Sequence, residues 1–213
     1  SESAEAQIDA ADELAWLGLS DPRLFDIIEK NLKAHAMDVD KPGANYAAWM
    51  AKGLAYSGND KYRATLEDVA ANAGHKNTRK HATNALELLA QHKRWNPIIT
   101  GNGQAISGLS IEQTGYANML KSGDYELQRI AAKRIYHERI RNSFLLGLLL
   151  DETQKALAKE GMERDEADAA AHMLKALATT SDPKYRALVE DTAANNKDKN
   201  LRKWAERYLK SYY

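Results

Sequence analysis

Apolar residues recur at helical spacing along most of the chain. Between Ala170 and Tyr212 they fall at positions i, i+3, i+4 and i+7 in three successive stretches, which is the pattern of amphipathic helices. The stretch from Ala47 to Leu89 shows the same three groups. No segment alternates apolar and polar residues as a half-buried strand would. The pattern therefore predicts an all-α protein.

Several residues predict where helices begin. Asp21 and Asp182 each precede a proline, and an aspartate before a proline at the first helical position is a typical N-terminal cap. Further cap candidates precede other apolar-periodic stretches: Asn59, Ser110 with Gln113, and Asp124.

The chain contains an internal duplication. Residues 47–86 align without a gap on residues 170–209, and about half of the aligned positions are identical. Within each copy, similar helices recur after 35 residues, which indicates a smaller unit of two antiparallel helices. We therefore expect an α-solenoid of about five antiparallel helix pairs, forming a single domain over residues 1–213. Tyr62 and Tyr185 are expected to fill equivalent interfaces.

The repeat resembles a known family. A turn that begins Asp-Pro is followed by a helix, a polar loop, and an arginine with an alanine three residues later (Arg79 to Ala82, Arg202 to Ala205). The order of these parts resembles the HEAT repeat of the HEAT/armadillo class, especially its short bacterial form. The resemblance covers nearly the whole chain and is clear again at residues 122–135. It implies a solenoid whose concave surface binds other proteins.

The resemblance also implies a role for two aspartates. In HEAT-like repeats an acidic residue of the first helix often meets the arginine that opens the second. This implies structural ion pairs between Asp68 and Arg79 and between Asp191 and Arg202. Glu67 and its neighbour Asp68 point about 100° apart on a helix, so adjacent carboxylates of this kind do not face a common substrate.

Composition narrows the possible partners. The chain has 30 basic and 30 acidic residues and a formal net charge of zero, whereas proteins that bind nucleic acid usually carry a basic excess. The longest apolar run, residues 144–150, is far shorter than the roughly twenty residues that span a bilayer. We expect neither nucleic-acid binding nor a membrane span.

Cysteine is absent, which excludes disulfides, zinc thiolate sites and a thiol nucleophile. Together with the small, polar start at Ser1, this favours an exported or periplasmic protein, with a cytoplasmic protein as the alternative.

No residue pattern indicates catalysis. The six histidines contain no i, i+4 pair, so the helical zinc-site spacing is missing. His81 takes the place of Trp204 in the duplication and is expected to be a core residue. No nucleophile elbow, phosphate loop or cofactor fingerprint is present. We therefore predict a non-enzymatic protein with no catalytic, cofactor or metal residues and no cofactor.

The candidate contact residues are polar or aromatic. Residues 93–110 interrupt the repeat and are predicted to form an irregular loop, and Trp95 and Asn96 in this segment are candidates for contact with a partner. The polar side of the second helices adds Lys80, Asn84 and Arg207. The predicted function is a protein–protein interaction scaffold, with the monomer favoured.

Two alternatives stay open. One is a nucleic-acid-binding protein with a basic groove, as in the HEAT-like DNA glycosylases that the fold resembles. The other is an enzyme subunit resembling the HEAT-like bilin lyases, in which a solenoid cradles a substrate protein.

Overall fold

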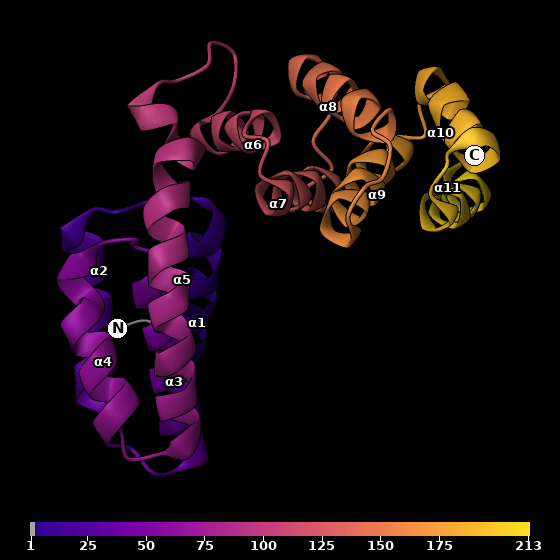
Figure 1. The fold of residues 1–213 in the computed structure, drawn as a ribbon. Helices are drawn as coiled ribbons and strands as arrows, with labels where there is room; N and C mark the ends of the chain where they lie inside the picture. Colours follow the sequence, from indigo (N-terminus) through magenta and orange to yellow (C-terminus); the bar gives the residue numbers. More distant parts are fainter. Residues whose placement is uncertain (1–2) are drawn as a thin grey trace. The chain divides into compact units, whose positions relative to one another are not determined.

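The computed structural model describes residues 3–213, which form eleven α-helices and no strand (Figure 1). The all-α prediction is confirmed. Whereas the sequence predicted one domain over residues 1–213, the residues group into two compact units, unit 1 up to Gln104 and unit 2 from Ala105. The boundary lies inside the segment 93–110 that was predicted to interrupt the repeat. None of the helices described is long and apolar enough to cross a membrane.

Unit 1 consists of two helical layers. Its helices are α1 (Ala4–Glu13), α2 (Pro22–His35), α3 (Lys41–Ala55), α4 (Arg63–Asn72) and α5 (Lys76–Thr100), with short 3-10 turns at Leu14–Trp16, Asp60–Tyr62 and Gly101–Gly103. In one layer α3 packs against α1 and α5, and in the other α2 and α4 cover it. We call the first the odd-numbered layer. The core between the layers includes fully buried Phe25, Leu32, Leu54, Tyr62, Leu66 and Leu89.

Unit 2 repeats this organisation. Its helices are α6 (Ile111–Lys121), α7 (Tyr125–His137), α8 (Ser143–Leu157), α9 (Arg164–Ala178), α10 (Pro183–Asn195) and α11 (Lys199–Tyr212). In its odd-numbered layer α9 packs against α7 and α11. Short turns join α2 to α3, α4 to α5, α6 to α7, α8 to α9 and α10 to α11, so the described chain holds five helix pairs, the number predicted.

The predicted helix starts are confirmed. The Asp21 carboxylate accepts a hydrogen bond from the Arg23 N–H at 2.9 Å, and the Asp182 carboxylate accepts one from the Lys184 N–H at 3.0 Å. Both helices begin at the following proline. Asn59, Ser110 and Asp124 also cap the elements that follow them.

The two copies of the duplication share local detail. Tyr62 and Tyr185 are both buried. The ammonium of the preceding lysine lies over each ring, with Lys61 5.3 Å from the Tyr62 centroid and Lys184 4.7 Å from the Tyr185 centroid. The two tyrosines therefore share burial and the lysine contact, whereas the Tyr62 hydroxyl also donates to the Asp26 carboxylate at 2.8 Å.

The implied partners of Asp68 and Asp191 were wrong. The Asp68 carboxylate accepts a hydrogen bond from Asn72 Nδ2, and the Asp191 carboxylate accepts one from Asn195 Nδ2, both at 2.8 Å. Each aspartate is thus satisfied within its own helix by the residue four positions later. Both copies keep the Asp and Asn for this contact.

The arginines Arg79 and Arg202 bind backbone carbonyls instead of aspartates. Arg79 Nη1 donates to the Ala73 carbonyl at 2.5 Å, and Arg202 Nη1 donates to the Asn196 carbonyl at 2.6 Å. These carbonyls follow the last residues of α4 and α10, where the helix leaves its acceptors without intrahelical partners. Each guanidinium therefore closes the turn between the two helices of a pair.

The segment 93–110 is more regular than predicted. Helix α5 continues through Pro97 to Thr100 and ends at Gly101, whose φ of 56° is left-handed. Proline removes only one backbone donor, and Asn96 anchors this last part of the helix by donating from Nδ2 to the Tyr56 and Ser57 carbonyls at 2.9 and 3.0 Å. The irregular connection is therefore confined to residues after Gly103.

Candidate functional site

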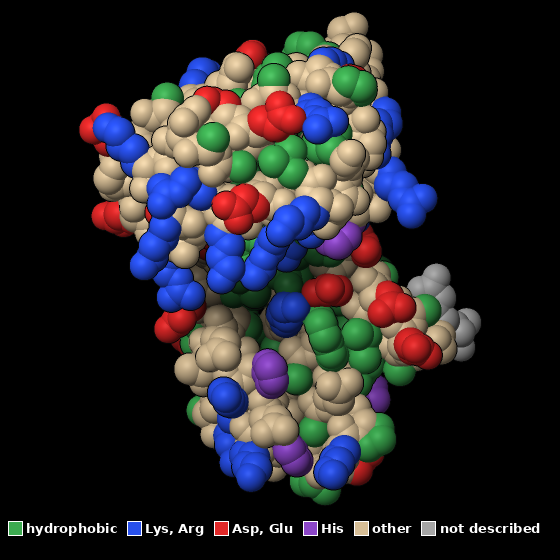
Figure 2. All heavy atoms as spheres, turned by 90° about the vertical axis from the view of Figure 1, so that its right-hand side faces the viewer, with side chains coloured by type: hydrophobic (Ala, Val, Ile, Leu, Met, Phe, Trp, Pro, Cys, Tyr) green, Lys and Arg blue, Asp and Glu red, His purple; other side chains and the backbone are tan. Residues whose placement is uncertain are grey.

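A groove of about 770 Å³ lies between α3 and α5 of unit 1, and we call it groove 1. Its floor is made by small and apolar residues, Ala48, Ala85 and Leu88. Hydrophobic and histidine side chains are exposed among charged ones on this face of unit 1, the lower half of Figure 2. The walls carry larger polar and aromatic side chains: Asn45, Trp49, Lys52, His81, Asn84, Glu87, Gln91 and Arg94.

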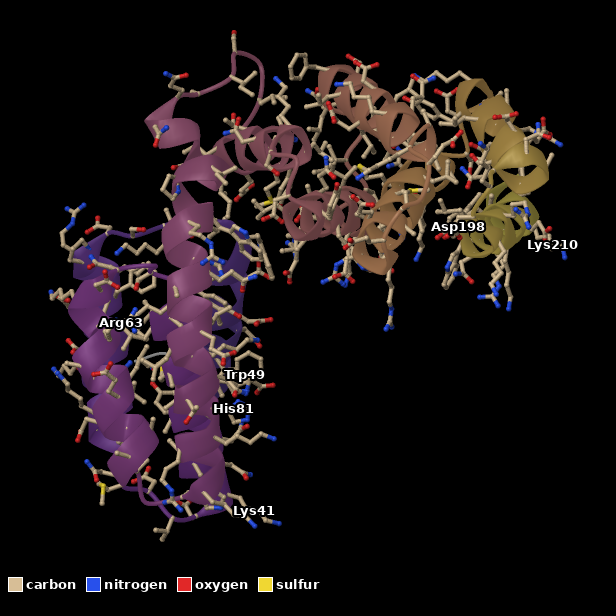
Figure 3. The ribbon with its side chains drawn as sticks, viewed as in Figure 1. Lys41, Trp49, Arg63, His81, Asp198 and Lys210 are labelled. Carbon is tan, nitrogen blue, oxygen red and sulfur yellow. The ribbon has the colours of Figure 1, made fainter. Side chains whose placement is uncertain are left out.

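Helical spacing explains this lining. His81, Asn84, Leu88 and Gln91 follow one another at intervals of three and four residues, so they form one stripe along α5. Figure 3 shows Trp49 of α3 and His81 of α5 on the same side of unit 1. The small side chains of Ala48 on α3 and Ala85 on α5 border the groove.

Lys52 fixes one wall of groove 1. Its ammonium lies 4.2 Å from the centroid of the Trp49 ring and donates to the Asp12 carboxylate at 2.9 Å. Burial by itself would lower the pKa of Lys52, but hydrogen bonds with Asp12 and Tyr56 outweigh it and raise the pKa above its usual value. Lys52 therefore stays charged at neutral pH and holds the indole in place.

A second groove, groove 2, of about 940 Å³ lies at the N-terminal ends of α7, α9 and α11. Five carboxylates and two guanidinium groups line it, so its charge is negative. The lining residues are Asp124, Tyr125, Glu126, Arg129, Met162, Arg164, Asp165, Ala167, Asp168, Asp198, Asn200, Leu201 and Trp204.

Part of this negative charge has a structural role. Asp124 and Asp198 cap α7 and α11, and carboxylates are favoured at helix N-termini. The Arg129 guanidinium lies 3.7 Å from a carboxylate oxygen of Glu126 and 3.7 Å from one of Asp168, which joins α7 to α9. The Trp204 side chain, 42% exposed, borders the groove.

A lysine–glutamate pair supports the groove 2 wall. Lys159 donates to the Glu166 carboxylate and also to the Tyr125 hydroxyl, the latter at 3.0 Å. The hydrogen bond from Lys159 lowers the pKa of Glu166 to about 2. The Glu166 carboxylate in turn accepts from the Glu163 N–H at 2.8 Å, which completes the cap of α9.

The two grooves share one pair of corresponding positions on each helix. Asn45 and His81 line groove 1, and their counterparts Asp168 and Trp204, 123 positions later, line groove 2. Some buried positions are identical in the two copies, as in Met50 with Met173 and Leu54 with Leu177. At exposed groove positions they differ. Part of the packing is therefore shared by the two copies, and the side chains at the grooves are not.

The structure places the predicted contact residues differently. Asn84 lines groove 1. Lys80 is exposed on α5 but does not line the groove. The Arg207 guanidinium lies 4.9 Å from the centroid of Trp204, a residue of groove 2. Trp95 and Asn96 are 6% and 4% exposed, so their assignment as partner-contacting residues is corrected to a structural role in the core of unit 1.

The expectation for His81 was also wrong. Its counterpart Trp204 suggested a core position, but both side chains are exposed and lie at the grooves. Sequence reasoning missed Trp49, Tyr125 and Asp168 as groove residues. Within residues 3–213, no group of three or more His, Asp or Glu side chains lies close enough to hold a metal ion.

Comparisons with known proteins show a distant likeness. No family model matches the chain, and no curated protein matches it. A solved structure of human deoxyhypusine hydroxylase in complex with glycerol aligns with a TM-score of 0.41 and 13% sequence identity, covering 100% of this chain and 81% of that one. A likeness at this level carries no conclusion about activity.

Proposed function

We propose that the chain is a non-enzymatic protein-binding scaffold built as a HEAT-like α-solenoid. Support for the architecture comes from the five helix pairs and from the sequential packing of the odd-numbered helices within each unit. The observation that carries the function is that each unit has a solvent-open groove lined by aromatic and charged side chains of its odd-numbered helices.

The groove side chains are suited to binding protein. Trp, Tyr and Arg supply much of the binding energy of protein interfaces, and the grooves contain Trp49, Arg94, Tyr125, Arg129 and Trp204. Amide side chains in groove 1 can pair with the backbone of a bound segment in both directions. We infer that a partner protein lies along the odd-numbered layer of each unit.

The duplication supports two different contacts. Groove 1 includes two basic side chains, Lys52 and Arg94, and one carboxylate, whereas groove 2 is lined by an excess of carboxylates. Opposite charge would therefore favour different segments of a partner. We propose an exported or periplasmic setting and a monomeric state for this scaffold.

Nucleic-acid binding is a second candidate, favoured by one observation. Lys and Arg side chains gather on the face of unit 2 in the upper half of Figure 2. Burial, and after it the charges of Lys175, Lys133 and Arg134, lower the pKa of His137. Salt-dependent binding of a 20-bp duplex would support this candidate. The carboxylates of groove 2 and the zero net charge favour protein instead.

Site-specific photo-crosslinking in the source cell tests the proposed function. A photoreactive amino acid replaces Asn84 or Trp204 at the grooves, or, as controls, exposed Lys30 on α2 or Ala187 on α10. We expect discrete protein adducts from the groove positions and none from the controls. Equal labelling from both layers, or no protein adduct from either groove, would refute the scaffold.

A further inference from the structure

The two copies of the duplication differ in one buried position with a consequence for groove 1. In unit 2 the Tyr208 side chain is buried, and its hydroxyl donates to the Ala171 carbonyl of α9 at 3.3 Å. The ring stacks on Trp204, with centroids 6.2 Å apart and ring planes inclined by 26°. A tyrosine therefore fills the space between α9 and α11.

The corresponding place in unit 1 holds smaller side chains. The counterparts of Ala171 and Tyr208 are Ala48 and Ala85, and both line groove 1. Groove 2 is lined by neither Ala171 nor Tyr208. Groove 1 thus borders the position at which alanine replaces the tyrosine of the other copy.

We propose that groove 1 receives a tyrosine side chain of a partner protein, seated as Tyr208 is seated in unit 2. This inference rests on the proposed scaffold function. The Ala48 carbonyl is the acceptor for the hydroxyl, because a helical carbonyl keeps a second lone pair beside its backbone hydrogen bond. Tyr208 and Ala171 form this hydrogen bond between α11 and α9, the counterparts of α5 and α3.

The side chains on the walls of groove 1 favour an aromatic side chain over an aliphatic one. His81 takes the position of Trp204, the residue on which the Tyr208 ring stacks. Trp49 lies on the other helix with Lys52 over its indole. Aromatic groups on both helices favour stacked or edge-on contact with a phenol ring. The hydroxyl acceptor on Ala48 distinguishes tyrosine from phenylalanine.

The test transplants the tyrosine. The full chain and the variant Ala85→Tyr are used to select from a randomised peptide library displayed on phage, and peptides that bind only the unaltered chain are synthesised. We expect these peptides to share a tyrosine, and to lose at least about 30-fold in affinity when that tyrosine becomes alanine, the loss typical of a central interface residue. Replacing the tyrosine by phenylalanine should weaken binding several-fold.

A reciprocal variant keeps the test independent of the stability of Ala85→Tyr. Tyr208→Ala should open the equivalent space in unit 2, so N-acetyl-tyrosinamide should shift NMR signals around Ala171 in that variant but only around Ala48 in the unaltered chain. N-acetyl-alaninamide is the control probe. Peptides that bind groove 1 without an aromatic residue, or the absence of shifts around Ala48, would overturn the inference.

These results separate the inference from the scaffold function. Crosslinking from Trp204 but no tyrosine-dependent binding at groove 1 would leave the scaffold standing and remove the tyrosine site. Absence of crosslinking from both grooves would count against the scaffold itself, whatever the library yields.

Discussion

His92 is predicted to make unit 1 sensitive to mild acid. Its ring is buried between Tyr56 and Trp95, at centroid distances of 4.9 and 5.5 Å. Asn96 donates from Nδ2 to backbone carbonyls, so its Oδ1 faces His92 Nδ1 at 3.1 Å and accepts the proton of the neutral ring. Burial lowers the pKa of His92 from 6.5 to about 4.

The magnitude follows from this pKa difference. Because the folded-state pKa lies below the unfolded value, the unfolded state binds the proton first as the pH falls. The contribution of neutral His92 to stability is fully present well above pH 6.5, decreases as the pH falls through 6.5, and is lost below pH 4. The pKa difference corresponds to about 3 kcal/mol in total, of which about 2 kcal/mol is lost between pH 7 and pH 5.

The variant His92→Gln removes the titration and keeps a hydrogen-bond donor toward Asn96. Urea unfolding at pH 7 and pH 5, followed by hydrogen exchange resolved to unit 1, should show that the unaltered chain loses about 2 kcal/mol more than the variant. His81→Gln, on the exposed side of the same helix, is the control. An equal loss in the unaltered chain and His92→Gln, or an NMR-measured His92 pKa near 6.5, would refute the reasoning.

Three further predictions follow from the contacts described. Asn96→Leu removes the donor to the Tyr56 and Ser57 carbonyls and should destabilise unit 1 by about 1–3 kcal/mol in urea unfolding; unchanged stability would show that these carbonyls find other donors. Glu166→Gln should destabilise unit 2 at pH 7, and the difference from the unaltered chain should shrink as the pH falls from 4.5 to about 2, because the folded-state pKa of Glu166 is lowered to about 2; a pH-independent difference in thermal melts would contradict this. Brief subtilisin digestion should cut within residues 104–110 and leave two folded fragments, whereas early cuts inside α3 or α9 would contradict the two-unit division.

Much of the helical framework could be predicted because it depends on local signals. Asp21 and Asp182 cap helices through atoms two residues away, and the duplication shows which positions face a core. Such features depend on neighbours in sequence, so one sequence is enough to find them.

The functional surface could be predicted only in part. Trp95 and Asn96 were misplaced because Pro97 suggests a helix end, while the contacts that keep α5 regular there come from residues about 40 positions away. His81 was wrongly predicted to be buried, because helical spacing places it beside the apolar face of α5 but does not tell a buried position from one on a groove wall. Ala85 aligns with Tyr208 of the other copy. This change from a large to a small residue was the feature of the sequence that could have indicated groove 1.

The arginine contacts at the turns have a consequence for how the chain reaches its native state. Arg79 and Arg202 each bind a carbonyl only six residues earlier, so the corner of each hairpin can close without any distant segment. Loop-closure entropy for such contacts is small, and chains rich in short-range contacts fold quickly. We therefore expect these hairpins to nucleate during synthesis, each before the next has left the ribosome.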